Sequence, residues 1–111
     1  MKVKGMNGQI EFTGDRVIIT RKGLLGMVAH GFAGTKEIPI KSISSVQLVK
    51  PSLFNRGYIQ FTYHGGKEPG PGVDGAAKDE NSVLLAKKHY QETEALKTAV
   101  IAAIAAMTTD S

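Results

Sequence analysis

The feature that most constrains the fold is a change in hydrophobic periodicity along the chain. Up to residue 86, apolar side chains recur at every second position in short runs that end at glycine, proline or another turn-forming residue, which is the pattern of half-buried strands. From about Tyr90 to Met107 the repeat becomes that of an amphipathic helix. Its apolar stripe comprises Leu96, Ala99, Val100, Ala103, Ile104 and Met107. Glu92 and Glu94 are expected near the helix start, where negative charge complements the helix dipole.

Six segments ahead of the helix carry the strand pattern, and turn-forming residues separate most of them. These segments are residues 9–13, 16–21, 35–40, 43–50, 58–63 and 82–86. Gly14 and Asp15 lie between the first two, which predicts a hairpin with a tight glycine turn. Pro39 has no amide hydrogen to donate to a sheet ladder, so it indicates an edge position or a strand end.

The alternation also assigns side chains to the faces of the sheet. We expect Val46 and Leu48 to face the core, with Gln47 between them facing solvent. In the following segment, the residues expected on one core face are Ile59, Phe61 and Tyr63. Aromatic side chains committed to a core cannot stack on bases, so a nucleic-acid partner is not expected.

The chain is expected to form a single domain over residues 1–111. Its 111 residues, 41% of them hydrophobic, are enough for one packed core. Strands are expected within residues 8–64 and 82–86, and the helix within 90–107. The intervening residues 65–80 hold five glycines and two prolines, which predicts a flexible loop.

Basic residues outnumber acidic ones by 14 to 10, which gives a formal net charge of +4. The excess lies in residues 1–64, where nine basic residues face three acidic ones, a balance of +6. A mildly positive surface suits phosphate or an acidic protein, but lysines scattered along strands also keep sheet edges from aggregating. The solubility explanation is the favoured one.

The residue types that most reactive sites need are absent or unsuitably placed. The chain has no cysteine, which excludes disulfides, thiolate metal sites and cysteine catalysis. Residues 70–75 match the letters of a dinucleotide-binding loop, but a strand follows them instead of a helix. His30, His64 and His89 are not at metal-ligand spacing. We therefore expect a protein that is not an enzyme and that binds no cofactor and no metal.

The sequence also carries signals that bear on location. The first residues lack the apolar core of a signal peptide. The longest apolar run, residues 99–107, is shorter than the roughly 20 residues that a membrane span requires. Together with the lack of cysteine, this favours a cytoplasmic location.

Six short packing and turn motifs follow one another along most of the chain. They are Gly8–Phe12, Ile38–Ile40, Ile43–Val46, Gly57–Phe61, Asp79–Val83 and Glu94–Leu96. In these motifs the chain resembles the bacterial pleckstrin-homology-like (PH-like) domains and, within them, a family of small bacterial and phage proteins. The resemblance implies a bent antiparallel sheet or partly open barrel capped by the C-terminal helix. It leaves the function open, because none of the motifs carries a reactive group.

The first candidate site is a basic surface around the opening hairpin. Its residues are Arg16, Arg21, Lys22 and Lys36. Lipid-binding members of the PH-like class hold inositol phosphates with basic residues in the corresponding region. Here the turn at Gly14 and Asp15 is too short and too acidic to enclose a phosphorylated headgroup, so specific phosphoinositide binding is not expected. The basic residues either attract anionic lipid headgroups or lie in solvated strands.

The second candidate site is an apolar segment interrupted by glycines. Its large side chains are Leu24, Leu25, Met27 and Phe32. Either this segment covers one mouth of the barrel, or it is exposed and contacts a protein partner, a membrane or a second copy of the chain in a homo-oligomer.

Two functional hypotheses remain. The first is a non-catalytic interaction module that presents an exposed strand edge, or the groove beside its helix, to a peptide or another subunit. The alternative is a peripheral binder of anionic phospholipid headgroups through the basic hairpin surface.

Overall fold

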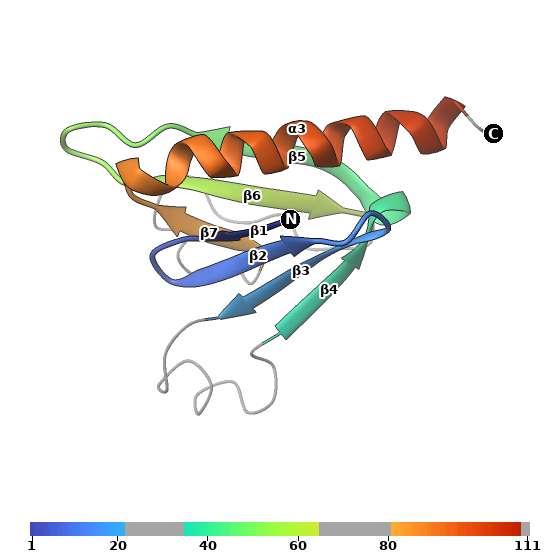
Figure 1. The fold of residues 1–111 in the computed structure, drawn as a ribbon, viewed down its shortest axis with the longest axis horizontal. Helices are drawn as coiled ribbons and strands as arrows, with labels where there is room; N and C mark the ends of the chain where they lie inside the picture. The colour runs from blue at the N-terminus through green and yellow to red at the C-terminus, as the bar shows by residue number, and fades with distance from the viewer. Residues whose placement is uncertain (22–34, 65–80, 110–111) are drawn as a thin grey trace.

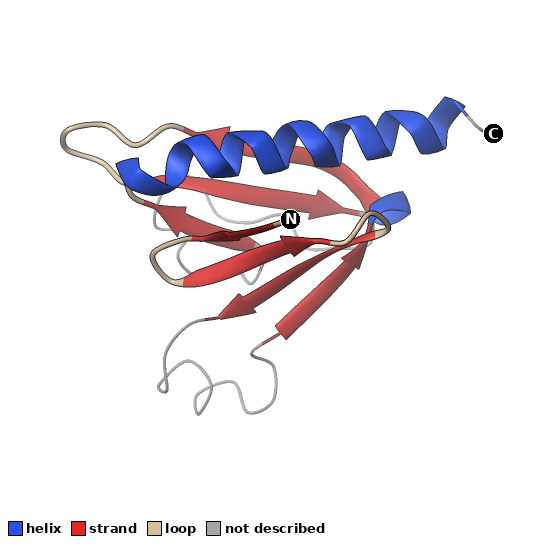
Figure 2. Cartoon of the chain, in the orientation of Figure 1, coloured by secondary structure: helices blue, strands red, loops and turns tan. Residues whose placement is uncertain are grey.

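The computed structural model describes residues 1–21, 35–64 and 81–109 of the chain. Within these ranges it contains seven strands, one 3₁₀ helix and one α-helix (Figures 1 and 2). In chain order they are β1 (Lys2–Lys4), β2 (Gly8–Phe12), β3 (Arg16–Arg21), β4 (Thr35–Pro39), η1 (Ile40–Ser42), β5 (Ile43–Val49), β6 (Gly57–Tyr63), β7 (Ser82–Leu85) and α3 (Lys87–Thr109). The predicted fold class, mainly β with one C-terminal helix, is confirmed.

The described strands form two sheets. Their orders are β1-β2-β3-β4 and β5-β6-β7, and neighbouring strands are antiparallel throughout. Over the described residues the two sheets do not close into a barrel. The helix α3 lies across them and contacts β1 of the first sheet and all three strands of the second (Figure 1). It therefore packs against both sheets at once.

The predicted glycine turn joins β2 to β3. Phe12 pairs with Val17, and the Thr13 amide donates to the carbonyl of Arg16 at 3.2 Å. Gly14 has a φ of +108°, a conformation that a residue with a Cβ rarely adopts. The sequence thus places glycine where the backbone of the turn requires it.

One hydrogen bond fixes the start of η1 against the first sheet, and two others join the first sheet to the second. Between β4 and β5, the amide of Ile40 donates to the carbonyl of Asp15 at 2.9 Å, and the Ile40 side chain is buried. On the far side, the amide of Leu84 donates to Oδ1 of Asn7 at 2.8 Å. The carbonyl of Leu84 accepts a hydrogen bond from the amide of Met6 at 2.7 Å. The turn between β1 and β2 is thereby fastened to β7.

One principal core lies between the sheets and the helix. Its fully buried side chains include Ile10, Val17, Ile59, Phe61, Val83, Leu85, Leu96 and Val100. Val46, Leu48 and Tyr63 pack against this core while Gln47 is exposed, so the predicted faces of both strands are confirmed. Tyr58 lies on the opposite face of β6, where it contacts Leu84 and Val49.

The helix begins earlier than the sequence pattern predicted. It starts at Lys87, because His89 caps it: the amide of Ala86 donates to His89 Nδ1 at 3.0 Å. The amide of His89 in turn donates to the carbonyl of Ala86 at 3.0 Å. Glu92 and Glu94 consequently lie beyond the first turn, so their predicted place at the helix start was wrong.

The apolar stripe of α3 also differs at one end from the prediction. Leu96 and Val100 are fully buried and Ile104 packs against the core, as expected, but Met107 is 44% exposed. Met107 is close to the C-terminal end of α3, and this end extends past the strands (Figure 1). Thr93 joins the buried face because its hydroxyl donates to the carbonyl of His89 at 2.7 Å, which satisfies the polar group.

Smaller differences concern strand ends. The predicted strands 35–40, 43–50 and 82–86 end one residue earlier, at Pro39, Val49 and Leu85. The prediction that Pro39 marks an edge or a strand end is confirmed, since β4 ends there and is an outer strand of the described sheet. The sequence pattern missed β1, whose three residues are too few to show alternation. The predicted flexible loop 65–80 lies outside the described residues.

Candidate functional site

The outer strands of the two described sheets differ in how well they are protected from pairing with another chain. Unpaired strand edges are normally blunted by charge, proline, short length or a covering segment. β1 has three residues with exposed Lys2 and Lys4. β4 carries Lys36 and Glu37 and ends in Pro39. Three of the usual protective devices therefore appear on the first sheet.

Among the described residues, protection of the second sheet is seen at one of its two outer strands. The amide and carbonyl of Leu84 in β7 are both occupied, by Asn7 and Met6 respectively. β5 is seven residues long, contains no charged residue and no proline, and has no described strand on its outer side. By these criteria β5 is the least protected edge in the described part of the chain.

The ladder register shows which backbone groups face this open edge. The amide of Phe61 donates to the carbonyl of Asn81, so the backbone amide and carbonyl of Phe61 face β7. Those of its neighbour Gln60 face β5. Gln60 pairs with Gln47, so the backbone amide and carbonyl of Gln47 face inward to β6. Because backbone groups alternate in direction, the amides and carbonyls of Val46 and Leu48 face outward.

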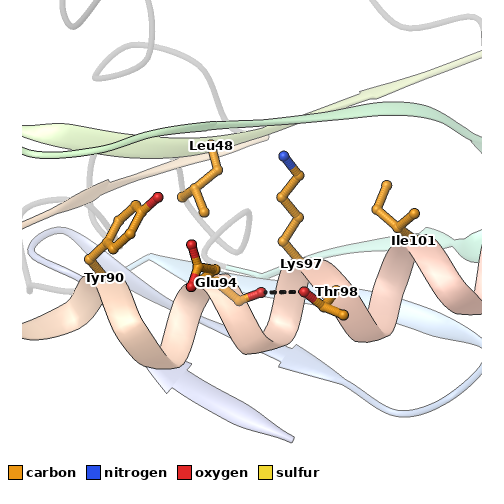
Figure 3. A pocket seen from close by; sticks show the side chains of 6 residues that line it. All are labelled: Leu48, Tyr90, Glu94, Lys97, Thr98 and Ile101. Carbon is orange, nitrogen blue, oxygen red and sulfur yellow. Dashed lines mark hydrogen bonds between the residues drawn. The ribbon is translucent and has the colours of Figure 1, made fainter.

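A groove lies between this edge and the helix (Figure 3). Its volume is about 450 Å³. Leu48 points into it from β5, and the remaining lining residues, all from one face of α3, are Tyr90, Glu94, Lys97, Thr98 and Ile101. An open strand edge and a partly apolar groove thus lie side by side.

The polar groups of the groove are already partly organised. Partial burial, and then the charge and hydrogen bonding of Glu94, raise the pKa of Tyr90 above its ordinary value of 10.0. The phenol therefore remains protonated at neutral pH and can donate a hydrogen bond. The Thr98 hydroxyl donates to the Glu94 carbonyl at 3.0 Å. Glu94 and Lys97 supply one charge of each sign, which suits a polypeptide better than a small anion.

Sequence reasoning pointed to a groove beside the helix but did not identify the residues that line it. Tyr90, Glu94, Lys97 and Ile101 recur at helical spacing, on a face next to the buried stripe. This spacing was available in the sequence. The position of β5 opposite these residues was not, because it depends on how the helix packs.

Two residues of the predicted basic surface, Arg16 and Lys36, lie on the neighbouring strands β3 and β4. Arg16 Nη1 lies 3.0 Å from Glu37 Oε1, and Arg16 Nε lies 3.5 Å from Asp15 Oδ1. The hydrogen bond to Glu37, and then the charge of Asp15, raise the pKa of Arg16 further above its ordinary value. Lys36 Nζ donates to the Tyr63 hydroxyl at 2.9 Å. The charge of Arg16 is thus offset by two carboxylates.

The other residues of the two predicted sites give no test. Arg21 ends β3, but its side chain is outside the described part of the structure. Lys22 lies outside the described residues, as do Leu24, Leu25, Met27 and Phe32 of the predicted apolar site.

The contacts of Asp15 with Thr13 and Arg16 predict how its carboxyl group titrates. The hydrogen bond from the Thr13 hydroxyl, at 2.8 Å, and then the charge of Arg16 lower the pKa of Asp15 below its ordinary value of 3.8. A lowered pKa in the folded state stabilises the protein above pH 3.8, and this contribution is lost as the pH falls through the lower folded value. We expect carboxyl NMR to give an Asp15 midpoint below 3.8 that rises in Thr13→Val. Ser44→Ala, on the other sheet, is the control and should not move it; an unchanged midpoint in Thr13→Val would contradict the assignment.

Two further properties of the described residues bear on other site types. These residues contain no cluster of three or more histidine and acidic side chains that could hold a metal ion. Over the same residues, α3 is not apolar enough to cross a bilayer.

The geometry defines a class of small β domain with two antiparallel sheets, one covering helix and an open strand edge beside that helix. Residues 10–101 match the model of a family described as a domain of unknown function, DUF4429. The chain belongs to the DUF4429 family, since the match spans most of its length. The chain matches no curated protein and no solved structure.

Proposed function

We propose that this protein is a non-catalytic, PH-like interaction module that binds an extended segment of a partner protein along β5. The observation that carries the proposal is the uncharged outer edge of β5 beside the groove of α3. A peptide added to this edge would pair with the outward backbone groups of Val46 and Leu48. Its alternate side chains would enter the groove, because side chains alternate between the faces of a strand.

The lining residues set the chemistry of the segment that fits. Leu48 and Ile101 favour apolar side chains at alternate positions of the peptide. Glu94 and Lys97 lie between the apolar residues of the helix and favour a polar or charged side chain of either sign. The fitting ligand is therefore an extended, mixed apolar and polar segment of about five residues.

The first test takes its peptide from a random library, so it requires no assumption about the identity of the partner. The library of linear peptides is panned against the full chain, and an enriched peptide is labelled and titrated by fluorescence anisotropy. We expect Ile101→Glu to weaken binding by about tenfold or more, because it places a charge in the apolar part of the groove. Met107→Glu is the matched control, since Ile101 and Met107 are 43% and 44% exposed on the same helix.

A second measurement asks whether the peptide adds to the sheet. Amide hydrogen exchange should slow at Val46 and Leu48 when the selected peptide binds, since these amides face the open edge. Equal affinities of wild type and Ile101→Glu, or unchanged exchange at both amides, would refute the proposed site. If the edge instead pairs with a second copy of the chain, sedimentation velocity will show a concentration-dependent mass that the Ile101→Glu variant lacks.

A further inference from the structure

The loop between β5 and β6 carries the two most exposed large apolar side chains in the described chain. Leu53 is 78% exposed and Phe54 is 89% exposed. They are adjacent at the turn of the hairpin, and we call this pair the tip. Neither residue belongs to the core or to the groove. Two neighbouring apolar side chains left in water indicate a contact that the isolated chain does not make.

The tip is held in a defined turn. The amide of Ser52 donates to the carbonyl of Asn55 at 2.8 Å, and the amide of Asn55 donates to the Ser52 hydroxyl at 3.1 Å. Pro51, immediately before the turn, is buried. The turn therefore projects both apolar side chains from a fixed base.

Exposed basic residues surround the base of the tip. Lys50 and Arg56 flank the turn in sequence. Gly57 pairs with Leu85, which brings the start of α3, with exposed Lys87 and Lys88, to the same end of the second sheet (Figure 1). Lys50 Nζ also lies 5.7 Å from the centre of the Tyr90 ring, which ties the loop to the first turn of the helix.

The charge at this end is predominantly positive. The first acidic residues within α3 are Glu92 and Glu94, which lie beyond the first turn of the helix. Four exposed cations therefore lie at the same end of the second sheet as the two apolar side chains, with no acidic residue in the loop itself.

We propose that the tip inserts into the interface of an anionic bilayer, with Lys50, Arg56 and the two helix lysines at the headgroups. The surface area of two side chains on a convex turn is far smaller than the roughly 800 Å² that each partner contributes to a standard protein interface. The two side chains do suit a bilayer interface, where a short apolar insertion and several basic residues together give reversible binding. The tip itself does not line the groove, although Lys50 contacts Tyr90 of the groove, and the insertion of the tip does not depend on the proposed peptide binding.

The chain has no tryptophan, so Phe54→Trp installs a single probe at the tip. At low salt we expect its emission to shift to the blue with vesicles of phosphatidylcholine and phosphatidylserine in a three-to-one ratio. The shift should be absent with phosphatidylcholine alone and should decline as salt is added, because the attraction is electrostatic. Met107→Trp, at the opposite end of α3, is the matched control and should show no shift.

Cosedimentation of unlabelled variants with the same mixed vesicles measures the two contributions. Leu53→Ser with Phe54→Ser should reduce the partition coefficient at least about tenfold, since two apolar side chains that would enter the bilayer are lost. Lys87→Gln with Lys88→Gln should reduce it by about tenfold or more. The control pair, Lys2→Gln with Lys4→Gln, removes the same charge from β1 and should have much less effect. Circular dichroism should show that all variants remain folded.

Three results would overturn the proposal. One is an unchanged Phe54→Trp emission with mixed vesicles at low salt. Another is equal cosedimentation of the wild type and the variant that combines Leu53→Ser with Phe54→Ser. The third is binding that Arg16→Gln removes while the tip substitutions do not, which would assign lipid contact to the first sheet.

Discussion

Leu96→Ala is expected to lower the free energy of unfolding by roughly 2–5 kcal/mol, the usual cost of removing a buried leucine side chain. Leu96 has no exposed surface and lies on the helix face that contacts strands of both sheets. Truncation would leave a cavity where three layers meet, and rigid strands on two sides limit how far the surroundings can collapse. A domain of this size has a total stability of about 5–15 kcal/mol, so the loss is a large fraction of it.

Urea unfolding followed by circular dichroism measures this change. The matched control is Ile101→Ala, on the same helix but 43% exposed, which should cost less than about 1 kcal/mol. If the two variants were equally stable, α3 would not be docked through Leu96 as described. That result would also contradict the position of α3 as one side of the groove.

Gly57→Ala is expected to destabilise the protein by about 3 kcal/mol, at the upper end of the usual cost of overpacking. A Cβ at this position would overlap the carbonyl oxygen of Val49 and would lie 2.7 Å from Cδ of Pro51. Neither obstacle can move by a side-chain rotation. The first residue of β6 must therefore separate from the end of β5, and the base of the hairpin must open.

Thermal and urea unfolding of Gly57→Ala can be compared with Arg56→Ala, whose exposed side chain is one residue earlier. The control should lie within about 0.5 kcal/mol of wild type. Amide NMR shifts of the first variant should change most around Val49 and Gly57. A cost below about 1 kcal/mol for Gly57→Ala would contradict the close approach of the two strands.

The sequence predicted the strands that have enough residues to show their period. β5 and β6 were assigned with the correct faces, since alternation over seven residues separates core from solvent. The three residues of β1 are too few to show a period. Its one buried side chain, Val3, lies between two lysines and so gives no strand pattern in the sequence. The His89 cap was missed because histidine is not among the residues that usually accept such a bond.

The candidate site was predictable only in outline. A groove beside the helix was an expectation, but its residues depend on which face of α3 lies opposite β5. Met107 shows the same limit: its spacing fits the buried stripe, yet it is 44% exposed, and the C-terminal end of the helix extends beyond the strands. The exposed pair Leu53 and Phe54 gave no signal, because apolar residues near a turn are just as compatible with burial.

The sequence alone determined the kind of each main element and most of the side chains that face the core, because both follow from a hydrophobic repeat that is local to a few turns or strand residues. The tertiary structure decided which backbone edges remain open. Asn7 covers the outer edge of β7 through a hydrogen bond to Leu84, 77 residues away, whereas no described strand pairs with the outer edge of β5. Such contacts join distant parts of the chain, so no local pattern encodes them, and the proposed peptide site depends on the edge that they leave uncovered.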